Sequence, residues 1–405
     1  MESERKVILC ILIVLLSVMQ GVSGLPVLVT RCGVLSVPGE YSLINNITNS
    51  PATTCIEITA SNVIFNGNGH TIDGTDTAQS HGIWIHGTTP ITNVVVSDVT
   101  LTQWNMGVYA LYARNAVIRA VRAEDNAYAG ISLSETNDTL IEGNEVRNNH
   151  VEEMYLWFSS NNTIRNNRIE APSTLSLALL VTESRETRIY NNYINNSRGI
   201  TARFANRWNT TMTPGTNIVG GPALGGNFWA TPAGNGYSET CTDSDANGFC
   251  DSPYILNANN TDRLQLSDPF LVKGCRRIVM PGTYHLKNDI LNSPAPVCIE
   301  IMGSDIRFDG GGHTIEGTGT SVSTGVAVYN LSRNPARVTI TDLTVQEWGD
   351  GVNWHPGSYG EITRSVSRDN VRTGMYFQKL SGISVADSTV TGNGVTQAPI
   401  IARSV

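Results

Sequence analysis

The chain has 405 residues and a formal net charge of −8, because 35 aspartates and glutamates outnumber 27 lysines and arginines. No basic block interrupts this acidic balance, which argues against a nucleic-acid partner. The length suggests about two domains.

The N-terminal segment has the pattern of a secretory signal peptide. Arg5 and Lys6 precede an apolar run from Val7 to Val18, and small residues follow up to Gly24. The run is shorter than the roughly 20 residues that span a bilayer, so we predict cleavage, with an uncleaved anchor as the alternative. No later segment is apolar enough to span. We therefore expect a secreted or cell-surface protein with no membrane span beyond residues 1–24.

The cysteines after this leader fall into three local pairs. Two of the pairs have the same separation of 23 residues, and no CxxC pattern is present that would favour a thiolate metal site. An even count in an exported chain predicts disulfides. The predicted pairs are Cys32–Cys55, Cys241–Cys250 and Cys275–Cys298. Possible glycosylation sequons begin at Asn46, Asn137, Asn161, Asn195, Asn209, Asn259 and Asn330.

Long segments of the chain occur twice. Residues 32–74 align without gaps with 275–317, and 94–108 match 338–352, so we infer a tandem duplication whose second copy is cut short. The nonapeptide "NGNGHTIDG" (66–74) returns as "DGGGHTIEG" (309–317). His70 and Asp73 do not share a strand face, and Glu316 replaces Asp73 in the second copy. We interpret this motif as a scaffold corner, not as a catalytic pair.

A finer period runs through the first copy. Aliphatic residues open short β-rich segments at intervals of 22, 23, 23 and 25 residues, at Val96, Ile118, Ile141, Ile164 and Ile189. The position three residues after each of these aliphatics forms a second column, and its last three members are Asn144, Asn167 and Asn192. This pattern predicts an all-β fold, a right-handed parallel β-helix, with an internal asparagine ladder. A leucine-rich repeat has the same period, but its leucine consensus and helices are absent.

The 22–25-residue period is absent from Thr201 to Gly274. Within this segment the side chains of Asp243, Asp245, Asn247 and Asp251 have the spacing of a calcium loop. Tyr254 stands where such a loop has a bidentate glutamate, and Asp262 could substitute. We predict a structural calcium ion, with an exposed turn held by Cys241–Cys250 as the alternative.

These features give four segments. Residues 1–24 form the signal peptide, 25–200 the first β-helix module, 201–274 the irregular segment with the calcium-like loop, and 275–405 the second, incomplete module.

Asparagine-rich coils followed by "GGNFW" and "DANGFCDSPYIL" resemble the NosD-like β-helix proteins of the carbohydrate-binding and sugar-hydrolase (CASH) superfamily, which are abundant in methanogenic archaea. The resemblance covers residues 93–200 and 225–270. It implies an exported β-helix, and the NosD name implies maturation of a copper site. Copper prefers clustered Met, Cys or His, and His81 with His86 is the only close pair of that kind.

Three functions remain. The favoured one is a non-catalytic module that binds glycans or forms a structural part of the cell surface, with polysaccharide or cell-surface components as partners. In the glycan-binding case, aromatic residues contact sugar rings. The alternative for these aromatics is loop packing. The glycan-contact candidates are Trp104, Tyr155, Trp157 and Trp348.

The second function is a polysaccharide lyase, epimerase or hydrolase that uses Asp98 and Asp125, with Arg119 and Arg122 nearby. Ordinary solvated turn residues are the competing interpretation. Copper handling is the third. Because the second module ends in mid-solenoid, we expect either a truncated gene or an end-to-end stacking partner at the C-terminus.

Overall fold

The computed structural model describes residues 25–245, 247–329, 335–394 and 400–403. The chain divides into two compact units, Met1–Asp268 and Pro269–Val405, and the division falls inside the predicted irregular segment 201–274. The predicted signal peptide and the sequon at Asn330 lie outside the described residues. In the part of the chain that is described, no helix has the length and apolar character needed to cross a membrane.

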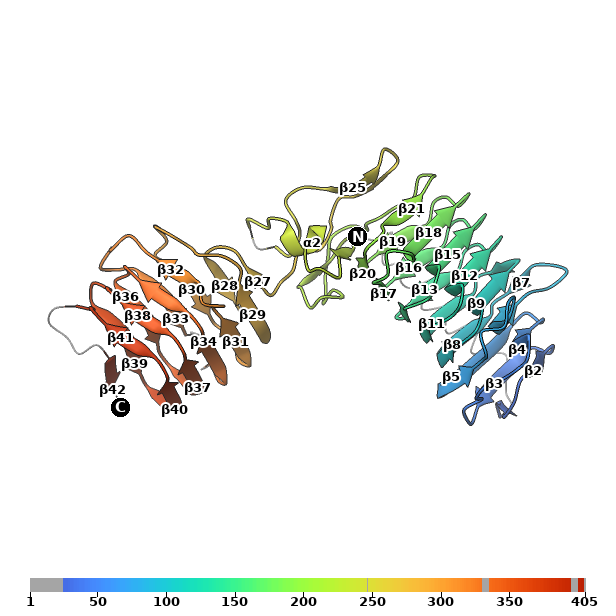
Figure 1. Ribbon diagram of the computed structural model, residues 1–405, viewed down its shortest axis with the longest axis horizontal. Helices are drawn as coiled ribbons and strands as arrows, with labels where there is room; N and C mark the ends of the chain where they lie inside the picture. Colours follow the sequence, from blue (N-terminus) through green and yellow to red (C-terminus); the bar gives the residue numbers. More distant parts are fainter. Residues whose placement is uncertain (1–24, 246, 330–334, 395–399, 404–405) are drawn as a thin grey trace, which may run out of the picture. The chain divides into compact units, whose positions relative to one another are not determined.

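Two parallel sheets, sheet A and sheet B, build the first unit (Figure 1). Sheet A consists of β1 (Val27–Val29), β3 (Gly39–Leu43), β5 (Val63–Asp73), β8 (Val95–Thr102), β11 (Val117–Glu124), β14 (Glu145–Arg147), β17 (Arg168–Ala171), β20 (Tyr193–Asn196) and β24 (Phe228–Ala230), joined by β13 (Leu140–Glu142), β16 (Thr163–Arg165) and β19 (Arg188–Tyr190). Sheet B consists of β2 (Gly33–Leu35), β4 (Thr54–Ile58), β6 (His81–Ile85), β9 (Met106–Leu111), β12 (Ala129–Ser134), β15 (Glu152–Trp157), β18 (Leu177–Thr182) and β21 (Ile200–Ala202).

Smaller elements complete this unit. They are the pair β7 (Ile91–Thr92) and β10 (Ala113–Arg114), the pair β22 (Thr213–Pro214) and β23 (Ala223–Leu224), the helix α2 (Tyr237–Thr240), and the pair β25 (Tyr254–Asn257) and β26 (Asn260–Asp262).

The aliphatic period seen in the sequence is the pairing register of the coils. Ile118 pairs with Ile141, Ile141 with Ile164, and Ile164 with Ile189. All four side chains are fully buried, so each coil places a β-branched residue on the one before it in the bore. The predicted parallel β-helix is confirmed.

The corners of the coils take the left-handed backbone conformation. One corner is occupied in successive coils by Asp98, Ala120, Gly143, Asn166 and Asn191, with φ between +49° and +63°. Glycine, asparagine and aspartate enter this region at the lowest cost. The Asn, Asp and Gly residues that punctuate the sequence therefore meet a backbone requirement at the corners.

The predicted asparagine column forms a buried ladder. The Nδ2 amide of Asn144 donates to Oδ1 of Asn167, Asn167 donates to Asn192, and Asn192 donates to Asn227, each at 2.9 Å. These bonds between side chains all run toward the C-terminal side, while each Nδ2 also donates to a backbone carbonyl of the preceding coil. The last member, Asn227, donates to Oδ2 of the fully buried Asp262 at 3.2 Å. A carboxylate accepts without needing to donate, so it ends the ladder.

A second ladder has the same polarity. Asn126 donates to Asn149 at 2.8 Å, and Asn149 donates to Oε2 of Glu153 at 2.5 Å. Glu153 is fully buried, and its Oε1 has no hydrogen-bond partner among the described residues. Burial raises the pKa of Glu153 to about 8 and that of Asp262 to about 7. Burial thus opposes the charge on the acid that ends each ladder, whereas the hydrogen bonds that each acid accepts favour the charged carboxylate.

The second unit repeats the plan with three parallel sheets. The first contains β27 (Leu271–Val272), β29 (Gly282–Leu286), β31 (Ile306–Asp309), β34 (Val338–Thr341), β37 (Gly357–Thr363) and β40 (Leu380–Ala386). The second contains β28 (Arg276–Ile278), β30 (Val297–Ile301), β33 (Thr324–Val328), β36 (Asp350–Trp354), β39 (Thr373–Gln378) and β42 (Ile400–Arg403). The third contains β32 (Thr314–Glu316), β35 (Thr344–Gln346), β38 (Val366–Arg368) and β41 (Thr389–Thr391).

The repeated nonapeptide is scaffold in both units. In the first, Oδ1 of Asn46 accepts the Thr71 amide at 3.0 Å and lies 3.2 Å from Nδ1 of His70, while Asp73 accepts the Asn49 amide at 3.0 Å. Asp289 takes the place of Asn46 beside His313 in the second unit. His70 thus contacts the Asn46 side chain while Asp73 accepts a backbone amide, and the two do not form a pair.

All three predicted disulfides are present, Cys32–Cys55, Cys241–Cys250 and Cys275–Cys298. The first and third join the second strand of each unit to the next coil of the same sheet. A loop of this size stabilises a fold by about 3 kcal/mol in the chain-entropy model.

We predict that Glu153→Gln increasingly stabilises the protein over the wild type as pH rises. The folded-state pKa of about 8 lies above the ordinary value of 4.5, so the wild-type contribution is largest below pH 4.5 and is lost as pH rises toward 8. Glutamine can accept from Asn149 and carries no charge. The free energy of unfolding, measured by denaturation from pH 4 to 9, should therefore fall less steeply in the variant.

Glu153→Ala is the control, because it removes the acceptor for Asn149 and should destabilise at every pH. Parallel pH profiles for the wild type and Glu153→Gln would contradict the assignment.

Candidate functional site

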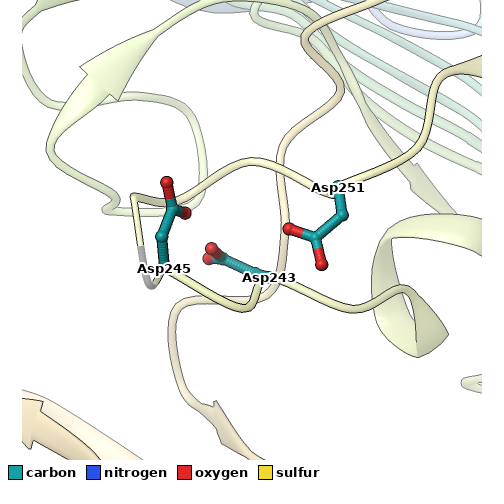
Figure 2. Close-up of side chains that lie close together, drawn as sticks. All are labelled: Asp243, Asp245 and Asp251. Carbon is teal, nitrogen blue, oxygen red and sulfur yellow. The ribbon is translucent and has the colours of Figure 1, made fainter.

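The three predicted aspartates lie together in one loop. Figure 2 shows the carboxylates of Asp243, Asp245 and Asp251 gathered on the loop, and one oxygen of each lies within 4.8 Å of the others. Asp243 is half-buried and accepts the Ser267 hydroxyl at 2.8 Å and the Gly248 amide at 3.0 Å. Oxygen donors of this kind suit a hard cation such as Ca²⁺.

Of the other two residues considered for this site, Asn247 lies in the same loop and Asp262 lies elsewhere. The side-chain amide of Asn247 donates to Asp245 at 2.9 Å, and its oxygen accepts the Phe249 amide, so Asn247 lies beside the carboxylates and its role as a calcium ligand stays a prediction. Asp262 is buried at the end of the asparagine ladder and also accepts the Trp229 indole N–H at 3.0 Å. Asp262 cannot complete the loop, and the expectation that it could substitute was wrong.

The carboxylates proposed for catalysis occupy two different corners. Asp98 lies level with Ala120, because the neighbouring Ser97 pairs with Arg119. Asp125 follows Glu124, which pairs with Thr102 at the other end of the strand. Both aspartates are exposed and have φ of +54°. They are corner residues that the fold does not bring into one site.

Of the two arginines expected near them, Arg119 is exposed, and Arg122 belongs to an ion-pair surface on the outside of sheet A. Oppositely charged residues alternate from coil to coil, so Arg122 pairs in register with Glu145, and Glu124 with Arg147. The Arg147–Glu124 contact measures 2.8 Å, and the Arg165–Glu142 contact measures 2.7 Å. These cations are already neutralised by glutamates, so this face does not offer them to an acidic substrate.

Two of the glycan-contact candidates are core residues. Trp104 and Trp348 have no exposed surface. Their indole N–H groups donate to the carbonyls of Ile72 at 3.0 Å and Ile315 at 3.1 Å. An aromatic ring without exposed surface cannot contact a sugar, so this prediction was wrong for both tryptophans. Their recurrence in the two modules reflects a shared packing role.

Tyr155 and Trp157, in contrast, lie on the outer face of sheet B. Met154 and Leu156 point into the bore, and the alternate residues Tyr155 and Trp157 point outward. Trp157 is 39% exposed, and its neighbour Phe158 is 50% exposed. The two rings meet edge to face at 4.9 Å between centroids.

These rings border a surface hollow of about 460 Å³. Tyr112, which is 45% exposed, supplies a third aromatic wall. Arg114, Glu135 and Asn137 add polar groups to the lining. The residues come from the ends of the coils that contain β9, β12 and β15, strands that lie side by side in Figure 1.

A column of stacked rings continues along the same face. Trp84 stacks on His86 at 3.6 Å, His81 stacks on Tyr109 at 5.3 Å, and Trp84 and Tyr109 are parallel to within 8° at 6.4 Å. Burial lowers the pKa of His81 to about 4, so this imidazole stays neutral near pH 7. Sequence reasoning missed these rings, although the coil period places Trp84 and Tyr109 one above the other on neighbouring coils.

The sequon asparagines with described side chains vary in exposure. Asn46, Asn161 and Asn259 are exposed, whereas Asn137, Asn195 and Asn209 are half-buried. Asn137 also lines the hollow, so a glycan there would fill it.

The model of a protein family described as "Periplasmic copper-binding protein (NosD)" matches residues 23–234, more than half of the chain. The chain belongs to the NosD family. The comparison with curated proteins found no match.

Solved structures similar to this NosD-family chain share little sequence with it. The A-module of a mannuronan C-5 epimerase from Azotobacter vinelandii is 11% identical, with 91% of this chain and 80% of that chain covered and a TM-score of 0.20. An alginate lyase from Paenibacillus sp. is 12% identical, with 89% of this chain and 99% of that chain covered and a TM-score of 0.22. PfbA, a surface adhesin of Streptococcus pneumoniae, is 13% identical, with 90% of this chain and 84% of that chain covered and a TM-score of 0.28. Scores this low carry no argument about activity.

The donor groups of this NosD-family chain do not fit the copper named by its family. Copper sites gather imidazole, thiolate or thioether ligands. In the described ranges, the one group of three or more His, Cys, Asp or Glu side chains with converging donor atoms is the aspartate loop, which offers oxygen only. The six cysteines among the described residues are in disulfides, and His86 lies 2.8 Å from a carboxylate oxygen of Glu57. We therefore derive no copper chemistry.

Trp104→Ala should destabilise the first unit by about 3–5 kcal/mol, because it leaves a cavity in the core and orphans the Ile72 carbonyl. Trp157→Ala is the matched control, and its partly exposed ring should change the free energy of unfolding by less than about 1 kcal/mol. Chemical denaturation of both variants checks the distinction. Equal losses would show that Trp157 also packs a core.

Proposed function

We propose that this chain is an exported, non-catalytic glycan-binding protein whose first unit contacts sugars through the hollow beside Trp157. The hollow combines aromatic rings with polar groups able to exchange hydrogen bonds with hydroxyls. Apolar ring faces with a few placed polar groups are the usual composition of small-ligand sites. The exposed cluster of Tyr112, Trp157 and Phe158 carries the proposal. Exposing several aromatic rings side by side to water is unfavourable, and such clusters usually mark a surface that binds a ligand.

The polar lining supports the same function. Glu135 lies against the Tyr112 hydroxyl and raises the pKa of that phenol, so Tyr112 keeps its proton throughout the physiological range. Arg114 is exposed beside them. Hydroxyl, guanidinium and carboxylate groups together offer both donors and acceptors to a polyol.

An extracellular or periplasmic setting suits this function. The disulfides and the family description are consistent with export from the cytoplasm. Such a protein would meet polysaccharide or cell-surface components there. Stacking of a partner on the C-terminal coil stays a prediction.

We predict that Trp157→Ala weakens binding to any glycan recognised by the wild type at least tenfold, because it removes one aromatic wall. A glycan array followed by titration calorimetry measures the change. Protein without N-linked glycans should be used, since Asn137 lines the hollow.

Trp104→Phe serves as the matched control, since it alters a buried tryptophan of the same unit and should leave affinity unchanged. Wild-type protein that binds nothing on a panel of neutral and acidic polysaccharides would refute the proposed function.

We also propose that Asp243, Asp245 and Asp251 bind a structural calcium ion. The disulfide Cys241–Cys250 closes this loop and limits its freedom before the ion binds. With three carboxylates converging, a cation would relieve their mutual repulsion. The role is structural because the loop belongs to the segment that also supplies Asn227 and Asp262 to the asparagine ladder.

Calcium at 100 times its dissociation constant should stabilise the first unit by about 2.7 kcal/mol. Thermal melting with calcium or with chelator, together with calorimetric titration, measures this effect. Asp243→Asn should abolish the calcium-dependent shift. An equal melting temperature in calcium and in chelator would refute the proposed calcium site.

A further inference from the structure

The hollow beside Trp157 crosses the coils and does not follow one of them. Its lining residues belong to successive coils, in the order Pro90, Tyr112 and Arg114, Glu135 and Asn137, and Trp157 and Phe158. Within any one coil they occupy no more than three consecutive positions, whereas three coil spacings of about 4.8 Å extend over about 14 Å along the axis. The long direction of the hollow is therefore parallel to the axis of the β-helix, across β9, β12 and β15 (Figure 1).

Two aromatic walls of the hollow lie two coils apart. The corner residues that directly follow β9, β12 and β15 are Tyr112, Glu135 and Phe158. They stay in register, because the backbone amides of Tyr112 and Glu135 each donate to the carbonyl just before the corresponding corner of the next coil, at 3.1 and 2.9 Å. Two coil spacings place the corners of Tyr112 and Phe158 about 9.6 Å apart, with Glu135 between them.

The backbone at both aromatic corners disfavours the residues found there. Tyr112 has φ of +57° and Phe158 has φ of +46°. In the described part of the first unit, the other non-glycine residues with positive φ are Asn, Asp, Gln, Glu or Ala, so both aromatic exceptions line the hollow. A bulky residue in this conformation is strained, and such strain concentrates at functional sites. The two rings therefore lower stability, which indicates a role for them outside folding.

Polar groups lie on the coils of Tyr112 and Glu135. The Glu135 carboxylate accepts the Tyr112 hydroxyl. Oδ1 of Asn137 accepts the Ser160 amide at 2.7 Å, which leaves the N–H groups of this side chain for a ligand. The exposed Arg114 guanidinium forms no ion pair with any residue that the structure describes. The hollow thus offers hydrogen-bond donors and an acceptor beside its rings.

An extended β-1,4-linked glycan has the same period as these coils. One coil advances along the axis by about 4.8 Å, which is close to the length of one pyranose in such a chain. Because successive sugars are turned over, every second sugar presents the same face to one side. Tyr112 and Phe158 can therefore contact equivalent faces of alternate sugars. An α-1,4-linked chain curls and advances less per sugar, so it loses this register.

We infer that the hollow binds an extended β-1,4-linked glycan that runs parallel to the axis, with one sugar per coil and with Tyr112 and Phe158 in contact with alternate sugars. This inference rests on the proposed glycan-binding function, and it adds the linkage class of the ligand and the direction in which the chain lies. Glu135 and Asn137 exchange hydrogen bonds with the hydroxyls of the sugar between the two rings.

The second unit supplies a matched control. Tyr359 is its one aromatic residue with positive φ in the described ranges, with φ of +52° and 68% exposure. In the duplicated sequence Tyr359 corresponds to Asn115, which has φ of +51° and does not line the hollow. Tyr359→Asn therefore makes the same change as Tyr112→Asn, at an exposed corner of the same conformation, and leaves the hollow intact.

The experiment measures calorimetric binding of full-length protein without N-linked glycans. The ligands are hexasaccharides of β-1,4-linked glucose, mannose and N-acetylglucosamine, and the α-1,4-linked glucose hexasaccharide as linkage isomer. We expect at least one β-linked hexasaccharide to bind at least about tenfold more tightly than the α-linked one. It should also bind at least about tenfold more tightly than its own disaccharide, which reaches only two coils.

The corner variants test the two rings. Tyr112→Asn and Phe158→Asn should each weaken the binding of that hexasaccharide at least about tenfold, and Tyr359→Asn should leave it unchanged. Asparagine enters the left-handed conformation at lower cost, so both corner variants should melt at the temperature of the wild type or above it. A lower melting temperature in both would show that the rings are retained for packing, which overturns their assignment as contacts.

The outcomes separate this inference from the proposed function. If Trp157→Ala weakens binding while Tyr112→Asn and Phe158→Asn do not, the hollow binds sugar but the contacts with alternate sugars are refuted. An α-linked hexasaccharide or a disaccharide that binds as tightly as the β-linked hexasaccharide refutes the extended chain. If the wild type binds other glycans but none of these β-linked ones, this inference fails alone. If it binds no glycan, both fail.

Discussion

The hydrogen bonds between the side chains of the buried asparagines, which all run in one direction, are the constraint on which the first unit depends. Each amide in the column of Asn144, Asn167 and Asn192 needs an acceptor in the next coil and supplies one to the coil before it. A coil that slipped by one residue would lose this acceptor and turn its aliphatic residues out of the bore. The ladders thus fix the register along with the apolar core.

Because the interior fixes the coils, the outer faces are free to differ. The two units keep the buried tryptophans Trp104 and Trp348 and the asparagines that bond their amides, Asn126 and Asn370. Outside, Trp84 of the first unit corresponds to Ala327 in the second. A binding face can therefore change from copy to copy without loss of the fold, and divergence between the copies indicates where function lies.

The sequence alone predicted the fold because coil geometry is periodic. The column from Ile118 to Ile189 and the asparagine ladder follow directly from spacing, and the cysteines paired as their positions indicated. The candidate site was harder to predict from the sequence. Trp104 and Trp157 are both aromatic residues within β-rich repeats, and only their phase in the coil decides that one is buried and the other exposed. The hollow unites residues from three coils whose neighbourhood depends on irregular corners that spacing does not describe.

The direction of the ladders also determines how such a unit can grow. At its N-terminal end, the oxygen of Asn144 accepts the backbone amide of Val121 at 2.9 Å, a donor that any residue except proline supplies. At the opposite end the ladder closes on Asp262, which receives donors only. An extra repeat inserted before Asn144 needs no special partner, whereas one inserted beyond Asn227 must either provide its own carboxylate or displace the existing one. Lengthening by repeat duplication is therefore easier on the N-terminal side of the ladder.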